Sequence, residues 1–543
     1  MRSRSLIATL VVVLAAASGC VGAIDDPDDT PTASAKGTGS KLEASVRDPI
    51  VERIRALLPG RNITRLPKVA LAGDGARKDA IIKLGRALVF DKILSDNHDI
   101  SCMTCHAPAR GTDEDRHLPE GVRGTGVGPE RTGGLTIARN APPLFDLHAM
   151  DSLFWDGRVE RLADGSYRTP AGAQLTPAMT SVFELGALSA IGMFPVTSRD
   201  EMREHGPDGR FDDLTSVADT DFTGIWEAEM NRLRAIPAYR TMFGKAYPSW
   251  PGSESNRIDT MTFAHASNAM AAYIASEYDL MDSPWDDFLA GKNDAFAWVE
   301  SWTALRPPMI SELSVLRGAE RFLQTCANCH NGPTLSDERF HNTAVAQLGP
   351  GAGDGELALD DFGRARVATD ASARCGNPGS GASCRYAFRT TPLRNVLLTA
   401  PFGHAGEFGR PTNDPDFLTD LHADYGDLRA FVAHYAVDPA ANLRAYDVSQ
   451  IDEALQPSLL ANTEDIIAHI DPLFATGSPV ALADVDDLTA FMFALTSKKL
   501  LDKGDETGSS RQLALCKQIP PSVPSGLPVD GDPYDAGYCK HYD

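Results

Sequence analysis

Two stretches of the chain place a pair of cysteines two residues apart and follow the second one directly with a histidine. The pattern occurs as Cys102, Cys105 and His106, and again as Cys326, Cys329 and His330. This spacing attaches c-type haem, because the two thiols bond covalently to the porphyrin and the adjacent imidazole binds the iron. With nine cysteines and thirteen histidines in 543 residues, two chance occurrences would be very rare. The sequence therefore predicts two covalently bound haems.

Three other kinds of site use similar residues. A zinc site would ask for a second ligand pair nearby, and a thioredoxin-like redox pair has no need of the histidine. A disulfide beside an incidental histidine is the third alternative. None of them explains why the complete motif is repeated, so haem attachment is the favoured interpretation.

The other five cysteines fall into a lone residue and two pairs close in sequence. Cys375 with Cys384 and Cys516 with Cys539 are predicted disulfides, since an exported chain occupies an oxidising compartment. Free thiols are the alternative for these four residues. Cys20 is left for a different chemistry.

The N-terminus has the pattern of an export signal. Arg2 and Arg4 precede an apolar run that ends in small residues at Cys20. The Ala-Ser-Gly-Cys ending resembles a bacterial lipoprotein signal, with Cys20 as the lipidated residue and an envelope location facing the periplasm or the exterior. Cleavage near Gly19 as an ordinary secretory signal is the alternative.

Composition narrows the class of partner. The formal net charge is -23, which argues against nucleic acid because phosphate backbones repel an acidic surface. Basic proteins and small molecules are the favoured partners. No run after the signal approaches the length of a bilayer span, so membrane contact is expected only through the lipid anchor.

Helical segments must position the two motifs. Apolar residues recur at spacings of three and four in 78–91 and 311–324, directly before the motifs, and again in 261–281 and 486–500. Strand signals are scarce. Proline-containing turns, ARNAPPL and FRTTPLRN, follow both motifs. We therefore predict a mainly α fold with two cytochrome c-like haem domains related by duplication, with long loops and insertions.

The predicted organisation has five parts. They are a signal peptide at 1–19, a disordered tether at 20–45 rich in Asp, Pro, Thr, Ser and Gly, an N-terminal haem domain at 46–300, a C-terminal haem domain at 301–505, and a tail at 506–543.

From about residue 78 to 500 the chain resembles the bacterial di-haem cytochrome c peroxidase and MauG family. The resemblance rests on LGRALVFDKILS before SCMTCH, then RNAPPLF, FWDGR and PVTSRDEM, followed by CANCHNGPTLSD, FRTTPLRN and LTAPFGHAG. The motifs appear in family order with near-family spacing. The family implies a peroxide-binding first haem and an electron-transfer second haem.

The resemblance assigns roles to residues that would otherwise be unremarkable. Glu201, in PVTSRDEM, matches the catalytic acid and base beside the first haem, where a carboxylate can move a proton between peroxide oxygens. Trp155 matches a tryptophan between the haems that can relay an electron. The resemblance also implies a calcium ion between the haems, with the ligands Asn140, Thr399 and Pro401.

The sixth ligand of the second iron separates two branches of the family. Peroxidases carry a methionine there, and MauG-like members carry a tyrosine, which lowers the iron potential. In GDLRAFVAHYAVD the aligned residue is Tyr435, and no methionine follows before Met492. His434 is the internal competitor, about 100° around a helix. A five-coordinate or otherwise ligated second iron is the third alternative. His404 matches a family histidine near the second haem.

The chain departs from the peroxidase pattern at the first haem. The position of the family's distal histidine falls on Val122, which predicts an iron open to peroxide. His117 is nearby, and its charged, Gly-rich loop favours a solvated histidine. Segments 205–260 and 438–485 exceed compact family members and offer room for a partner surface.

The expected function is reduction of hydrogen peroxide with electrons from an external protein, as in MauG-like oxidation of a protein side chain. A cytochrome c peroxidase with a small cytochrome or cupredoxin donor is the alternative within the family. A non-enzymatic electron-transfer cytochrome is the alternative from another class, and Glu201 in its segment counts against it.

Overall fold

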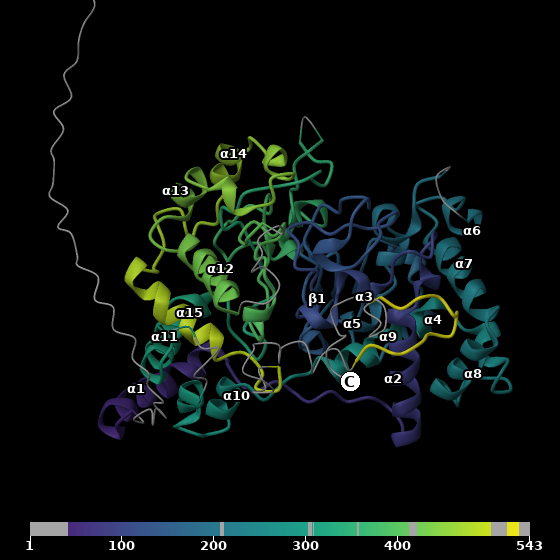
Figure 1. Cartoon of the computed structure of the whole chain (residues 1–543), viewed down its shortest axis with the longest axis horizontal. Helices are drawn as coiled ribbons and strands as arrows, with labels where there is room; N and C mark the ends of the chain where they lie inside the picture. Colours follow the sequence, from purple (N-terminus) through teal and green to yellow (C-terminus); the bar gives the residue numbers. More distant parts are fainter. Residues whose placement is uncertain are drawn as a thin grey trace, which may run out of the picture. The chain divides into compact units, whose positions relative to one another are not determined.

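Each CxxCH motif follows a helix that packs very closely on a later helix. The computed structural model describes residues 42–206, 211–301, 307, 309–355, 358–411, 421–500 and 518–530. In the first half, α2 (Gly75–Phe90) packs on α9 (Phe263–Glu277). In the second half, α11 (Glu312–Gln324) packs on α15 (Val485–Phe493). Both pairs lie side by side in Figure 1.

A glycine permits the close approach in both pairs. A Cβ on Gly85 would lie 1.9 Å from the carbonyl oxygen of Ala269, and a Cβ on Gly318 would lie 1.8 Å from that of Asp487. Such distances are far inside van der Waals contact, so only glycine allows these helices to meet. The repeated arrangement supports the predicted duplication.

The predicted helices are confirmed with shifted ends. The segment 78–91 belongs to α2, 311–324 to α11 and 261–281 to α9. The segment 486–500 is helical only as far as Phe493. A non-helical loop follows through Ser497.

The other α-helices of the described residues differ widely in length. They are α1 (Ala44–Leu57), α3 (Cys102–Cys105), α4 (Pro177–Thr180), α5 (Ala187–Ile191), α6 (Asp212–Thr215), α7 (Phe222–Arg234), α8 (Pro237–Ala246), α10 (Pro284–Leu289), α12 (Leu421–His434), α13 (Pro439–Arg444) and α14 (Thr463–Ala468).

Strands among the described residues are two or three residues long. An antiparallel sheet has the order β1 (Ser152–Leu153), β2 (Val159–Arg161) and β3 (Tyr167–Arg168), and β4 (Phe340–His341) pairs antiparallel with β5 (Phe388–Arg389). The fold is mainly helical, as predicted. From Lys41 onward the chain is one compact unit, and the boundary between haem domains at residue 300 stays a prediction.

The C-terminal segment 518–530 returns to the first motif. The Asp91 carboxylate accepts hydrogen bonds from the backbone and hydroxyl of Ser525 at 3.2 and 2.5 Å. Asp530 accepts one from Thr104, which lies between the two cysteines of the first motif. Segment 518–530 therefore holds the first haem motif and the end of the preceding helix in place. Cys20, Cys516 and Cys539 lie outside the described residues, as do the signal and most of the tether.

In the part of the chain that the structure describes, no helix combines the length and the apolar character that a bilayer crossing requires.

Replacement of Gly318 by Ala should destabilise the protein by about 1–3 kcal/mol, because the added methyl group forces α11 away from α15. Chemical denaturation followed by circular dichroism measures the change. Gly426→Ala in α12 is the matched control, since nothing lies within 4 Å of its added Cβ; its effect should stay within about 1 kcal/mol. Equal effects of the two substitutions would contradict the packing argument.

Candidate active site

The first CxxCH motif forms a single helical turn that presents a neutral imidazole. Helix α3 begins after Ser101, whose side chain and that of Thr104 cap its start. His106 Nδ1 donates a hydrogen bond to the carbonyl oxygen of Thr112 at 3.2 Å. Burial lowers the pKa of His106 to about 4. The ring is therefore neutral with Nε2 free, which is the state that binds iron.

The second motif repeats this arrangement at a large cavity. His330 Nδ1 donates to the carbonyl oxygen of Leu335 at 3.0 Å, and burial lowers the pKa of His330. Cys326, Cys329 and His330 line the cavity. Its other walls are mostly apolar and include Leu393, Val396, Phe402, Leu428, Phe431, Val432 and Leu488. Two thiols, a neutral histidine and apolar walls fit a covalently attached haem.

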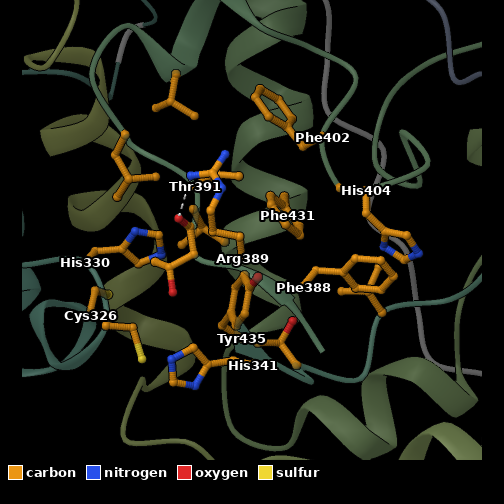
Figure 2. A pocket seen from close by; sticks show the side chains of 18 of the residues that line it. Cys326, His330, His341, Phe388, Arg389, Thr391, Phe402, His404, Phe431 and Tyr435 are labelled. Carbon is orange, nitrogen blue, oxygen red and sulfur yellow. Dashed lines mark hydrogen bonds between the residues drawn. The ribbon is translucent and has the colours of Figure 1, made fainter. Parts of the chain in front are cut away.

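Tyr435 and His434 have different surroundings at this cavity. Tyr435 is one of its lining residues, and Figure 2 shows it among the side chains with His330 and Cys326. Burial raises the pKa of Tyr435 to about 12, although a hydrogen bond with Thr343 acts in the opposite direction. His434 is buried behind the wall, with Nε2 3.0 Å from the carbonyl oxygen of Thr343. The thioether of Met492 also reaches the cavity.

Glu201 lies on a π-helical turn, Arg199–Arg203, a kind of turn frequent at functional sites. Ser198 Oγ accepts a hydrogen bond from the Glu201 amide at 3.3 Å. Burial raises the pKa of the Glu201 carboxyl. Burial is the main cause of the raised pKa values of the Cys102 and Cys105 thiols, and the charge of Glu201 adds to both. Glu201 therefore lies within electrostatic range of the first haem motif.

Val122 packs beside the Glu201 segment. Its amide donates to the carbonyl oxygen of Asp200 at 3.1 Å, and its side chain is completely buried. An aliphatic side chain offers no ligand atom to a metal. The residue at the position of the family's distal histidine is thus next to the proposed acid and base.

Trp155 and the three expected calcium ligands meet at the second cavity. The Trp155 indole donates to the carbonyl oxygen of Asn140 at 2.8 Å. The Asn140 amide nitrogen donates to the Pro401 carbonyl at 3.1 Å, and Thr399 lines the same cavity. Asn140 Oδ1 is buried without a hydrogen-bond partner in the described chain. An orphaned amide oxygen on a side chain that contacts the Pro401 carbonyl fits a hard cation.

The solvated loop predicted around His117 is wrong. His117 is fully buried, its Nδ1 donates to the carbonyl oxygen of Gly406 at 2.6 Å, and its Nε2 is buried without a partner in the described chain. The loop's charges turn inward instead of facing solvent. Arg131, for example, donates to the carbonyl oxygens of Glu120 and Gly121 at 2.7 and 2.5 Å.

Two further predictions concern the second half. Cys375 and Cys384 form the predicted disulfide. His404 lines the second cavity, stacks on Phe388 with ring centroids 3.8 Å apart, and places Nδ1 2.8 Å from Glu407.

A buried histidine between two carboxylates escaped the sequence prediction. His341 Nδ1 lies 2.8 Å from Asp471 and Nε2 lies 3.4 Å from Asp337. Burial alone would lower the pKa of His341, but the two carboxylates and the Cys329 thiol outweigh it and raise the pKa to about 12. Asp471 is 130 residues away in the chain, so no local pattern could have revealed the pair.

Comparison with known proteins finds one family model that matches part of the chain. The model described as di-haem cytochrome c peroxidase matches residues 79–294. The methylamine utilization protein MauG of Methylorubrum extorquens is 24% identical over 330 residues, or 60% of this chain and 65% of that protein. The cytochrome c551 peroxidase of Pseudomonas aeruginosa is 26% identical over 330 residues, or 60% of this chain and 67% of that protein.

Among solved structures, a MauG-like protein associated with microbial copper homeostasis is 18% identical, with 81% of this chain and 95% of that chain covered at a TM-score of 0.46. The alignment with the MauG protein of Methylorubrum extorquens spans just under two thirds of the length of that protein.

The doubly paired His341 makes stability depend on pH. The Asp337 and Asp471 carboxylates raise its pKa on folding, so the stabilisation is complete below the unfolded value of about 6.5 and is lost as pH rises through the raised folded-state pKa. At pH 6, His341→Gln should cost about 3 kcal/mol or more, and its deficit relative to wild type should shrink at alkaline pH. Denaturant titrations of the haem-loaded protein measure both quantities.

His205→Gln is the matched control, because His205 pairs with Asp200 on the surface with both side chains about half exposed. Its effect should stay within about 1 kcal/mol. A deficit for His341→Gln that is constant from pH 6 to 10 would show that His341 is not held as an imidazolium.

Proposed function

We propose that this chain, which is similar to di-haem cytochrome c peroxidases and MauG proteins, is an oxidoreductase of their family that reduces hydrogen peroxide with electrons drawn from an external protein. The observation that carries the proposal is the partly buried Glu201 carboxyl, which lies on a π-helical turn and acts electrostatically on the thiols of the first motif. A protein that only carries electrons has no need of a buried acid at that place.

The proposed residues have two roles, haem attachment and proton transfer. Cys102, Cys105 and His106 would hold the first haem, and Cys326, Cys329 and His330 the second. When bound, the two haems supply the electron transfer and the redox chemistry of O–O cleavage. Glu201 takes a proton from one peroxide oxygen and returns it to the other, so that water can leave. Its raised pKa brings proton release closer to neutral pH than for an exposed carboxyl.

Trp155 is proposed to relay electrons between the two sites. Its hydrogen bond to the Asn140 carbonyl fixes the indole at the wall of the second cavity. Asn140, with Thr399 and Pro401, would also hold Ca²⁺. The one residue Asn140 would then contact both the relay tryptophan and the cation. Calcium would thereby keep the relay ring in place.

Tyr435 decides the kind of oxidation that we propose. A phenolate ligand lowers the iron potential and favours high oxidation states, which suits MauG-like oxidation of a protein side chain. The alternative is a peroxidase with a small cytochrome or cupredoxin donor, and the presence of Met492 at the same cavity is the observation that favours it. Export to the envelope through the signal, with lipidation of Cys20, completes the proposal.

Glu201→Gln should slow the reaction of the ferric or reduced protein with peroxide by about a hundredfold or more, because the amide cannot accept a proton. Stopped-flow absorbance in the Soret region measures the rate. Asp200→Asn is the neighbouring control and should leave the rate unchanged, since Asp200 is about half exposed and paired with His205. Similar rates for wild type and Glu201→Gln would remove the assignment, and two irons that are both low-spin and inert to peroxide would favour the electron carrier.

Tyr435→Met should raise the midpoint potential of one haem, because a thioether stabilises the reduced iron more than a phenolate does. Spectroelectrochemical titration, with electron paramagnetic resonance of the ferric protein, measures the shift. Met492→Leu is the control, because it removes the other side chain of this cavity that could bind the iron. The midpoint potential of this variant should match that of wild type. A shift confined to Met492→Leu would assign the ligand to Met492 instead.

A further inference from the structure

Residues 472–483, here called the apolar strip, form an unusual piece of surface. The sequence PLFATGSPVALA contains no charged residue and no histidine, although charged residues make up 23% of the chain. The strip lies inside the 438–485 segment that exceeds compact family members. Leu482 is 66% exposed, the largest value among the exposed large apolar side chains of the described residues.

Val437 extends this surface from the neighbouring segment. Its amide donates to the carbonyl oxygen of Val480 at 2.9 Å, and its own carbonyl accepts from the Ser478 amide at 2.8 Å. Val437 is 61% exposed and has a φ of 65°. A β-branched residue in the left-handed region is strained, and such strain is retained mainly where surrounding structure enforces it for function.

The strip is also a wall of the second haem site. Its residues Leu473, Phe474, Ser478, Pro479 and Val480 line the cavity that contains Cys326, His330 and Tyr435. Val437 follows Tyr435 by two residues. A protein seated on the strip would therefore contact the chain segments that form the wall of the second site, which is where electrons must enter under the proposed function.

Three acidic side chains of the second half are paired with arginines. Asp484 lies 2.7 Å from Arg321, Asp486 lies 2.5 Å from Arg429, and Glu464 lies 2.7 Å from Arg444. Asp438, directly after Val437, accepts a hydrogen bond from the Ala441 amide at 3.1 Å. A partner would therefore meet an apolar face with an acidic margin at short range. At long range the net charge of -23 attracts a cationic partner.

We propose that the apolar strip and Val437 are the docking face for the protein electron donor, a redox protein of net positive charge with an uncharged, apolar contact face. This inference rests on the proposed peroxidase function and assigns its partner surface. Apolar contact at the centre with steering by distant charge gives a complex that forms fast and dissociates fast, as turnover with a protein donor requires.

The test uses the haem-loaded full chain with reduced mitochondrial cytochrome c, which is basic, as the donor. The peroxide-dependent oxidation rate should fall as salt rises. Val437→Ser and Leu482→Ser should each lower kcat/KM for the cytochrome by about tenfold, mainly through KM. Val46→Ser is the matched control, because Val46 is also exposed, at 45%, but lies at the start of α1.

Val437→Gly separates docking from strain. Glycine adopts a φ of 65° without cost, so this variant should fold at least as stably as wild type and still show the reduced kcat/KM. Turnover with a small donor such as ABTS should be the same in every variant, since a small molecule needs no docking face.

The outcomes are distinct. Unchanged kcat/KM in the Val437 and Leu482 variants, or no oxidation of the basic cytochrome by a protein that turns over ABTS, would overturn the docking face. Absence of any peroxide reaction, with ABTS as well as with cytochrome, would overturn the proposed function itself.

Discussion

The structure depends on one hydrogen bond that occurs in each half, from the Nδ1 atom of a motif histidine to a carbonyl oxygen in the next turn of chain. His106 donates to Thr112 and His330 donates to Leu335. Each bond fixes the ring orientation and the tautomer, so that Nε2 is the free nitrogen. Burial keeps both rings neutral by lowering their pKa values. Because the bond runs to the backbone, it depends on the loop after the motif and not on a side chain that mutation could remove.

The two sites then differ in the chemistry of the side chains near each motif. Near the first motif stand a carboxyl and an aliphatic side chain, Glu201 and Val122, which offer a proton acceptor and no strong metal ligand. The second cavity contains the phenol of Tyr435. Burial raises the pKa of both Glu201 and Tyr435, since it penalises the charged form. A nearby cation would reverse the penalty for the phenol by stabilising phenolate, whereas a proton donor benefits from it.

The sequence was sufficient to predict those features whose determining contacts are local in the chain. The CxxCH motifs, the helices before them and the disulfide between Cys375 and Cys384 all involve residues close in the chain. The pairing of His341 with Asp471 and the fastening of Asp91 by Ser525 join residues more than a hundred positions apart, and the sequence contains no signal for them. The burial of His117 was missed for a related reason, because a charged loop is expected to face solvent unless its charges find partners inside the fold.

The two long segments that we expect to be additions, 205–260 and 438–485, contact the two sites from outside. In segment 205–260, Asp219 binds Arg199 and Arg203 at 2.6 and 3.1 Å, and these two arginines are the ends of the turn that carries Glu201. In segment 438–485, Asp471 holds His341 at the cavity wall of the second site. A turn with π-helical bonding is less stable than an α-helical one, so an external ion pair at both ends is a physical reason to keep the extra chain. The added segments are therefore part of the architecture of the two sites, and the apolar strip is the surface that the second of them leaves facing outward.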